Sequence, residues 1–287
     1  MTRSITTEAL HLIARGGQAE IYNYENGKVL RVAKRPQDFD RIRYEYRVYA
    51  SLLESGLTVP RTYELVEVDG APAIIMDKLT GTSMMTLIAK NPFTMRAKAR
   101  ELARLHLGLR NVTPATVLTP TKAKSEFCIK HSEILSDQTK EQVLKVLADL
   151  PEGDTLCHGD FHPGNVICSE NTNYLIDWVG ATRGDFYADV AHTYILLRVV
   201  PRVPHMNWVA YFMQRQVARA MAKSYLGEIS AQIALDRRSL SKWVLVNAAE
   251  RTYHGLESEK RDLKAFIDMY MEALSRNINQ EELYKLI

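Results

Sequence analysis

Two short glycine turns constrain the first eighty residues of this chain more than any other feature. Asn26-Gly27 separates the runs EIYNY and KVLRVA, and Asp69-Gly70 separates TYELVEV and APAIIM. Both central residues of a tight hairpin turn need positive φ, so Asn-Gly and Asp-Gly between strand-like runs predict β-hairpins. Residues 38–55, between the two hairpins, repeat apolar side chains at helical spacing. The order hairpin, helix, hairpin therefore predicts a small antiparallel sheet with one helix packed on it.

The pattern changes near residue 80, after which the chain reads as mainly helical. Helices are expected over residues 93–112 and 131–150, and four or five amphipathic helices from about residue 186. Short strands are expected at Thr155–Cys157, Val166–Cys168 and Tyr174–Ile176. We therefore predict an α+β fold with two lobes: residues 1–80 as a small sheet lobe and residues 81–287 as a larger helical lobe.

Composition excludes several classes of protein. The 287 residues are 46% hydrophobic and 25% charged, as in ordinary globular proteins, and the net charge of +3 is too small for a nucleic-acid-binding face. No apolar run approaches a membrane span, and the N-terminus lacks the apolar core of a signal peptide. Cys128, Cys157 and Cys168 have no metal-binding spacing and are odd in number, which favours reduced thiols and a cytoplasmic protein.

The run HGDFHPGN, residues 158–165, concentrates polar groups on a loop between two short strands. It is followed by YLIDW, which places Asp177 at the end of an apolar run. Two strands joined by the turn SENTN would bring Asn165 and Asp177 together. An amide oxygen and a carboxylate suit Mg²⁺, which takes substrate phosphates at its remaining positions. Asp160 is then left to act as a base on a hydroxyl group.

HGDFHPGN with the following IDW resembles the catalytic loop and metal segment of the aminoglycoside phosphotransferase and choline kinase-like family. The resemblance implies the protein-kinase fold and ATP- and Mg²⁺-dependent phosphorylation of a small hydroxylated molecule, such as an aminoglycoside, sugar or amino alcohol. It implies that Asp160 is the catalytic base and that Asn165 and Asp177 are the magnesium ligands. It also makes His158 a structural residue, and GDFYADVAH a segment that braces the loop.

The resemblance also assigns residues of the first lobe to the nucleotide. Gly16 and Gly17, with Gln18, precede the first hairpin and are expected to cover the phosphates, although no third glycine follows. Val29-Leu30-Arg31 matches the family's V-L-K, so Arg31 replaces the usual lysine. Lys34 is the rival cation, on the opposite face of the strand. Glu45, on the inward face of the helix, is the expected partner of that cation.

The segment AIIMDKLTG resembles the family's hinge. The resemblance implies that Met76 lines the base pocket and that the backbone of Asp77 and Leu79 bonds the edge of the base. Recognition through the backbone leaves GTP open beside ATP.

Two other functions compete with the kinase. His158, Asp160 and His162 have the H-x-D-x-H spacing of a zinc or manganese hydrolase, although that hypothesis explains neither Asn165 nor the glycine pair. A nucleotide-binding pseudokinase is the other, favoured only by Arg31. Residues 201–287 contain no constellation that identifies the acceptor, a protein partner or an oligomeric state.

Overall fold

The computed structural model describes residues 3–6, 8, 10–170, 172–199, 206–255 and 257–276. The chain divides into two compact units. The first contains Met1–Leu87, Ala115–Val117 and Gly164–Ala181, and the second contains Ile88–Pro114, Leu118–Pro163 and Thr182–Ile287. No helix among the described residues is long and apolar enough to cross a membrane.

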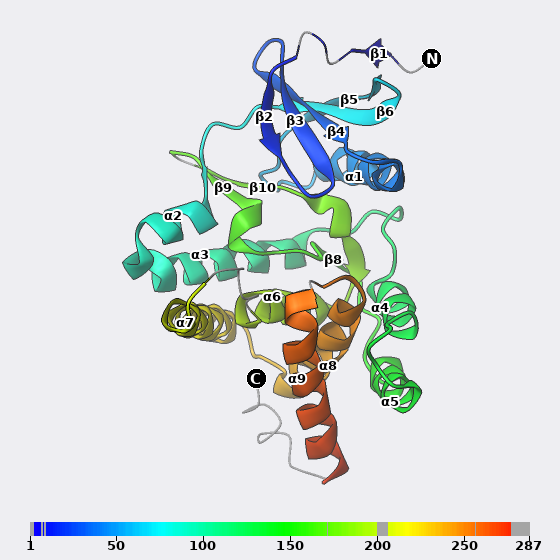
Figure 1. Cartoon of the computed structure of the whole chain (residues 1–287), viewed down its shortest axis with the longest axis vertical. Coiled ribbons are helices and arrows are strands. Elements are labelled where there is room, and N and C mark those ends of the chain that lie inside the picture. Colours follow the sequence, from blue (N-terminus) through cyan, green and yellow to red (C-terminus); the bar gives the residue numbers. More distant parts are fainter. Residues whose placement is uncertain are drawn as a thin grey trace. The chain divides into compact units, whose positions relative to one another are not determined.

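The first unit contains a six-stranded sheet in the order β1-β5-β6-β4-β3-β2 (Figure 1). Its strands are β1 (Ser4–Ile5), β2 (Leu12–Arg15), β3 (Ala19–Tyr24), β4 (Lys28–Ala33), β5 (Thr62–Val68) and β6 (Ala71–Asp77). Neighbouring strands are antiparallel except β1 and β5. The sheet extends beyond the two expected hairpins because β1 and β2 join its edges. The sequence did not predict β2, because three of its four residues are exposed and show no alternation.

Both glycine turns have the conformation that the sequence predicts. Asn26 and Gly27 have φ values of 56° and 72°, and Asp69 and Gly70 have values of 48° and 80°. The second turn is a two-residue hairpin, since Val68 pairs directly with Ala71. These turns set the register of β3 with β4 and of β5 with β6.

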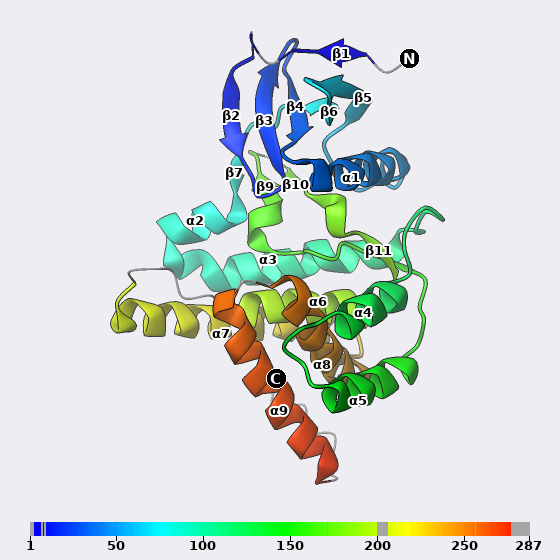
Figure 2. The ribbon, with the colours of Figure 1, turned by 45° about the vertical axis from the view of Figure 1, so that its right-hand side comes forward.

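Helix α1 (Phe39–Leu52) packs against the sheet and follows the short 3₁₀ helix η1 (Pro36–Asp38) (Figure 2). Its buried face contains Ile42, Glu45, Val48, Tyr49 and Leu52. Leu53 lies just beyond the end of the helix and is exposed, so the buried face ends with Leu52. On the sheet, Leu30 and Val32 belong to a cluster of buried apolar residues, and strand alternation turns Arg31 to the opposite face.

A second, three-stranded sheet completes the first unit. It contains β7 (Thr82–Ser83), β9 (Val166–Cys168) and β10 (Asn173–Leu175), in the order β10-β9-β7. β10 lies one residue earlier than the sequence suggested. A Cβ at Gly81 would lie 2.5 Å from the carbonyl oxygen of Cys168, so only glycine allows the chain before β7 to approach β9 this closely.

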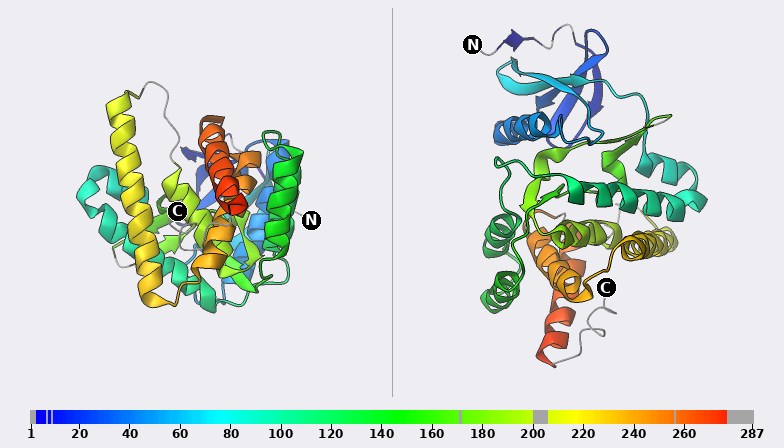
Figure 3. Two further views of the ribbon diagram at one scale, coloured as in Figure 1. Left: turned by 90° about the horizontal axis from the view of Figure 1, so that it is seen from below. Right: turned by 180° about the vertical axis from the view of Figure 1, so that it is seen from behind.

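The second unit is mainly helical (Figure 3). Its helices are α3 (Met95–Gly108), α4 (Thr121–Lys130), α5 (Asp137–Ala148), α6 (Phe186–Arg198), α7 (Trp208–Gln232), α8 (Arg237–His254) and α9 (Glu257–Ser275). Helix α2 (Met84–Lys90) crosses the division between the units, and the strands β8 (Thr155–Cys157) and β11 (Thr182–Gly184) pair antiparallel. The 3₁₀ helices η2 (Pro92–Thr94) and η3 (Leu109–Asn111) flank α3.

Two of the C-terminal helices are not amphipathic as expected. Most residues of α6 and of α8 are buried, because α6 packs on α7 and α8 while α8 packs on α4, α5, α6 and α9. A helix covered on all sides loses its polar face, and the 3.6-residue pattern disappears with it. The sequence also missed α4 and began α5 six residues early. Residues 277–287 of the expected helical lobe lie outside the described residues.

Candidate active site

Arg31 connects two acidic residues of the first unit. It lies on β4, between β3 and β6. Its Nε donates to Oε2 of Glu45 at 2.7 Å, and its Nη2 donates to Oδ1 of Asp177 at 2.9 Å. The rival cation Lys34 is exposed and lies just after the strand. The sequence had paired Arg31 with Glu45, and the structure adds the contact with Asp177.

Burial and charge act in opposite directions on this cluster. Burial disfavours the charge of Arg31, but Glu45 and Asp177 outweigh it and raise the pKa of the guanidinium above its ordinary value. Burial also raises the pKa of Glu45, against the opposing effect of Arg31. A single cation therefore holds two carboxylates, and one of them, Glu45, is fully buried.

Asp177 has an uncommon backbone conformation. Its φ of 66° and ψ of 64° lie in the left-handed region, which aspartate tolerates better than most residues. Its amide donates to the hydroxyl oxygen of the buried Tyr49 at 3.2 Å, and the 3₁₀ helix η5 (Trp178–Gly180) begins directly after it. About a third of the Asp177 side chain, 33%, is exposed. The left-handed backbone and Tyr49 thus fix the place of a carboxylate that a ligand can still reach.

Asn165 ends the 3₁₀ helix η4 (Pro163–Asn165) and precedes β9. Val166 pairs with Leu175 in the β9–β10 hairpin, and the amide of Ile176 donates to the carbonyl oxygen of Asn165 at 3.0 Å. Asn165 therefore lies opposite Ile176, beside Asp177. The hairpin that the sequence predicted is present, and the two expected metal ligands lie just outside it, Asn165 before β9 and Asp177 two residues after β10.

The chemistry of these two residues fits a magnesium ion. Asn165 offers an amide oxygen and Asp177 a carboxylate, both of which are hard donors. Two protein ligands suffice for Mg²⁺, which keeps waters and takes phosphate oxygens at its other positions. Asn165 and Asp177 would hold the ion, and their role as ligands stays a prediction.

The glycine pair forms the turn between β2 and β3. The amide of Gly16 donates to the carbonyl oxygen of Ala19 at 2.8 Å, and the amide of Lys34 donates to the carbonyl oxygen of Gln18 at 3.0 Å. Neither glycine has positive φ, so backbone conformation does not require them. A Cβ at Gly17 would meet no atom within 4 Å, so the space beside this part of the backbone is open. A phosphate could approach there, as the sequence suggested.

The expected hinge contains the last residues of β6 and those that follow it. Met76 is buried and Leu79 is half-buried. The amide of Asp77 donates to the carbonyl oxygen of Arg61 at 2.9 Å, and its carboxylate accepts hydrogen bonds from the amide of Arg61 and the hydroxyl of Tyr63. Because the Asp77 amide already has a partner, Leu79 is the better candidate for an N–H that bonds the edge of a base.

Asp160 belongs to the second unit. It follows Gly159, whose φ of 72° favours glycine. Its side chain is 37% exposed, and His162 Nε2 lies 3.7 Å from its Oδ2. Burial raises the pKa of Asp160, but the interaction with His162 outweighs burial, and the pKa lies below its usual range. Asp160 is therefore a carboxylate at neutral pH.

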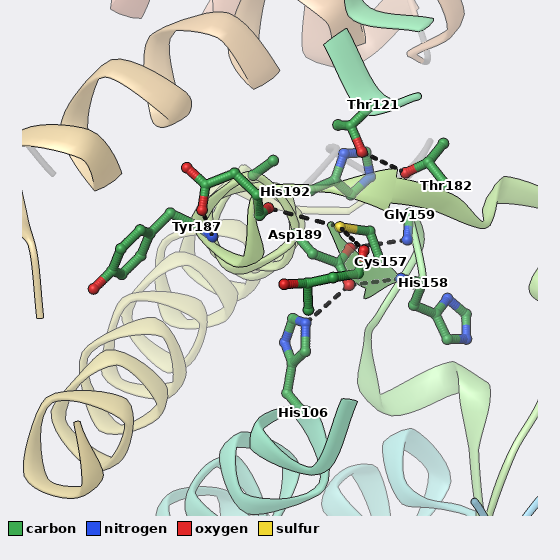
Figure 4. A network of polar contacts seen from close by, with 12 residues as sticks. His106, Thr121, Cys157, His158, Gly159, Thr182, Tyr187, Asp189 and His192 are labelled. Carbon is green, nitrogen blue, oxygen red and sulfur yellow. Dashed lines mark hydrogen bonds and ion pairs between the residues drawn. The ribbon is translucent and has the colours of Figure 1, made fainter. Parts of the chain in front are cut away.

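A buried network holds the residues just before Asp160 (Figure 4). Oδ2 of Asp189 accepts the amide of His158 at 2.6 Å, and Oδ1 accepts the amide of Gly159 at 2.9 Å. Nε2 of His106 lies 2.9 Å from Asp189 Oδ2, and because a carboxylate only accepts, this nitrogen carries the proton. Burial would raise the pKa of Asp189, but His106 and the amides hold it well below its usual range.

This network gives a physical form to the expected bracing segment. Asp185, its other acidic residue, caps α6 by accepting the amide of Tyr187 and also accepts the indole N–H of Trp243 at 2.8 Å. His106 is buried and bonds both Asp189 and the hydroxyl of Tyr225. Tyr225 had no signal in the sequence, because it lies 119 residues from His106.

The hydrolase constellation does not form a metal group. Among the described residues, one set of three His, Cys, Asp or Glu side chains has donor atoms all within 4.8 Å of one another, and it is not His158, Asp160 and His162. His158 is buried edge-on against Phe161 at 5.5 Å between ring centroids, as suits a structural residue of the loop.

Comparisons with known proteins identify the family of this chain. Residues 14–225 match the model of the phosphotransferase enzyme family, known as APH. No curated protein matches the sequence. The fold is similar to that of a thermostable variant of aminoglycoside phosphotransferase APH(4)-Ia solved with AMP-PNP and hygromycin B, with a TM-score of 0.60 and 16% identity over 97% of this chain and 94% of that one.

Two further solved structures share the fold. Aminoglycoside phosphotransferase APH(2'')-Ib with ADP has a TM-score of 0.55 at 16% identity, covering 97% of this chain and 93% of that chain. The streptomycin and ATP complex of APH(2'')-IIa has a TM-score of 0.56 at 16% identity, covering 96% and 93%. These similarities confirm the predicted α+β fold, with its N-terminal sheet and mainly helical C-terminal part.

Proposed function

Because the chain belongs to the phosphotransferase enzyme family, we propose that it transfers the γ-phosphate of ATP to a hydroxyl group of a small molecule, with magnesium. The observation that carries this proposal is the state of Asp177. It is bound to Arg31, held by Tyr49 through its backbone and still one-third exposed at 33%, beside Asn165 and just outside the β9–β10 hairpin.

Asp160 is the proposed base. Its carboxylate is charged at neutral pH and partly exposed, so it can accept a hydrogen bond from an alcohol. A depressed pKa makes it a weak base, which suits phosphoryl transfer because the loose transition state needs little activation of the attacking oxygen. Asp160 would orient the hydroxyl and take its proton late, while Asp189 keeps the preceding backbone in place.

The first unit supplies the charge for the nucleotide. Magnesium, when bound, neutralises charge on the β- and γ-phosphates. Arg31 would contribute a permanent cation next to the ligand Asp177, and its two nitrogens fix it against Glu45 and Asp177 at once. The glycine turn and the segment around Met76 and Leu79 would cover the phosphates and the base. On this proposal the first unit binds nucleotide and the second carries the acceptor.

The neighbours support this assignment of ligands. They were solved with AMP-PNP and hygromycin B, with ADP, and with streptomycin and ATP. A further neighbour was solved with GDP, which keeps GTP beside ATP as a donor. We propose a hydroxylated small molecule as acceptor: an aminoglycoside-like compound, a sugar or an amino alcohol.

The test is magnesium-dependent release of ADP across a panel of hydroxylated acceptors, with ATP and GTP compared as donors. Asp160→Asn should lower acceptor-dependent turnover by about 10²–10⁴-fold. Asp149→Asn, at an exposed carboxylate of the same unit, is the matched control and should retain turnover. Nucleotide binding without turnover on any acceptor would favour the pseudokinase, and turnover without nucleotide would favour the hydrolase.

A further inference from the structure

Three metal-binding side chains meet between α4 and the last turn of α8, within the second unit. Cys128 belongs to α4, and Glu250 and His254 belong to α8. Their donor atoms all lie within 4.8 Å of one another, and no other group of three His, Cys, Asp or Glu side chains among the described residues is this compact. Glu250 and His254 are four residues apart, so they share one face of α8 and point toward α4 together.

Two of the distances between the donor atoms are slightly longer than those of a tetrahedral zinc site. Sγ of Cys128 lies 3.7 Å from Nε2 of His254, and that nitrogen lies 3.7 Å from Oε1 of Glu250. Zinc bonds of about 2.0–2.3 Å at tetrahedral angles place neighbouring donors roughly 3.3–3.6 Å apart. Small movements of side chains would bring all three donors to bonding distance of one ion.

We propose that Cys128, Glu250 and His254 bind a zinc ion, with water as the fourth ligand. One sulfur, one imidazole nitrogen and one carboxylate oxygen favour zinc over magnesium or calcium, which take oxygen ligands. Cys128 and Glu250 are buried, while the His254 side chain is 43% exposed. The exposed side at His254 provides both the entry path and the position of the water.

Neighbouring groups orient the carboxylate and limit the affinity. The hydroxyl of Ser125 donates to Oε2 of Glu250 at 2.6 Å, which leaves Oε1 toward Cys128 and His254. Nζ of Lys124 lies 3.3 Å from that same Oε1, so without metal it balances the carboxylate. A bound ion shares Glu250 with this ammonium, and the repulsion between the two cations weakens binding.

Binding has a defined proton balance. The thiol of Cys128 gives its proton to solvent as the sulfur–zinc bond forms, and no oxidant or reductant takes part. Protons compete with the ion for the thiolate and for the imidazole, so metal affinity falls as the pH falls.

The experiment titrates the metal-free full chain with Zn²⁺ and with Cd²⁺ as a spectroscopic probe. We expect one equivalent to bind, an ultraviolet sulfur-to-cadmium charge-transfer band, and a higher Tm, because the ion joins α4 to α8.

Cys128→Ser should abolish the charge-transfer band, and His254→Gln should lower the affinity at least tenfold. His254→Gln changes an exposed side chain, so it serves if the buried Cys128 variant fails to fold. Cys168→Ser and His131→Gln, outside the cluster, are the matched controls and should bind as the parent does. Absence of stoichiometric binding, or unchanged binding in His254→Gln, would overturn the proposal. No readout measures phosphotransferase turnover, so the outcome of this experiment is independent of the proposed function.

Discussion

The two units hold their acidic residues in contrasting ways. In the first unit, Arg31 binds both the buried Glu45 and the partly exposed Asp177. In the second unit, the buried Asp189 is satisfied by His106 and two backbone amides, while Asp160 is partly exposed and lies near His162. Each unit thus pairs one buried carboxylate with one that solvent can reach.

This difference in burial separates carboxylates that hold other protein groups from carboxylates that can take part in a reaction. Glu45 and Asp189 are buried, so a ligand in solution cannot reach their oxygens. Asp177 at 33% exposure and Asp160 at 37% can be reached from solvent. Glu45 and Asp189 therefore hold groups of the protein, whereas on the proposed function Asp177 contacts the metal and Asp160 the substrate.

Removing the buried acceptor should cost the most stability. Asp189→Ala leaves two amides and His106 without their partner, and we expect a loss of about 3–5 kcal/mol in the free energy of unfolding. Asp160→Ala removes a partly exposed carboxylate beside His162 and should cost only about 1 kcal/mol, while lowering turnover by about 10²–10⁴-fold. Urea unfolding of both variants measures the difference. Equal losses of stability in the two variants would contradict the assignment of Asp189, and not Asp160, as the carboxylate that holds the fold.

Removing the charge of the buried Glu45 in the first unit should cause an intermediate loss of stability. Glu45→Gln keeps the shape but replaces a charged acceptor of Arg31, and we expect about 2 kcal/mol of lost stability. Arg31 would then be held by Asp177 alone, so the Michaelis constant for the nucleotide should also rise. Arg31→Lys, which keeps the charge, is the comparison variant. A stability loss in Glu45→Gln without a change in nucleotide affinity would contradict a role in positioning Arg31.

The acid dependence of stability should distinguish Asp189 further. Its native pKa lies below its unfolded value, so its contribution is fully present above about pH 4 and is lost as the pH falls toward the native pKa. Asp189→Asn should remove up to about 1.4 kcal/mol per pH unit from the acid slope. Unfolding free energies of parent and variant between pH 6 and pH 3 test this. Parallel curves would show that the carboxylate is not stabilised by folding.

An exposed carboxylate that also accepts two backbone amides should matter least. Asp236 caps α8 by accepting the amides of Arg238 and Ser239 at 2.9 and 3.2 Å, as Asp189 accepts two amides in the interior. Asp236→Ala should cost about 1 kcal/mol and leave turnover unchanged. Thermal unfolding and the ADP-release assay measure both effects. A cost equal to that of Asp189→Ala would mean that burial adds nothing to the two amide bonds.

Local signals predicted much of the first unit. Asn-Gly and Asp-Gly turns, and the inward position of Glu45 on α1, depend on neighbours within a few residues of one another. The weaker predictions concerned segments whose surroundings lie far away in sequence. Helices α6 and α8 lost their amphipathic pattern because other helices cover them, and β2 was missed because it lies exposed at a sheet edge.

The sequence by itself determined the family, the order of sheet and helices, and which residues are candidates for phosphoryl transfer, because motif spacing and turn chemistry are local properties. Only the tertiary structure decided that Arg31 joins Glu45 to Asp177, that Asp189 fixes the backbone before Asp160, and that Cys128 meets His254 across 126 residues. These contacts depend on how the chain packs in three dimensions. Burial then determines which carboxylates contact only protein groups and which stay accessible to ligands.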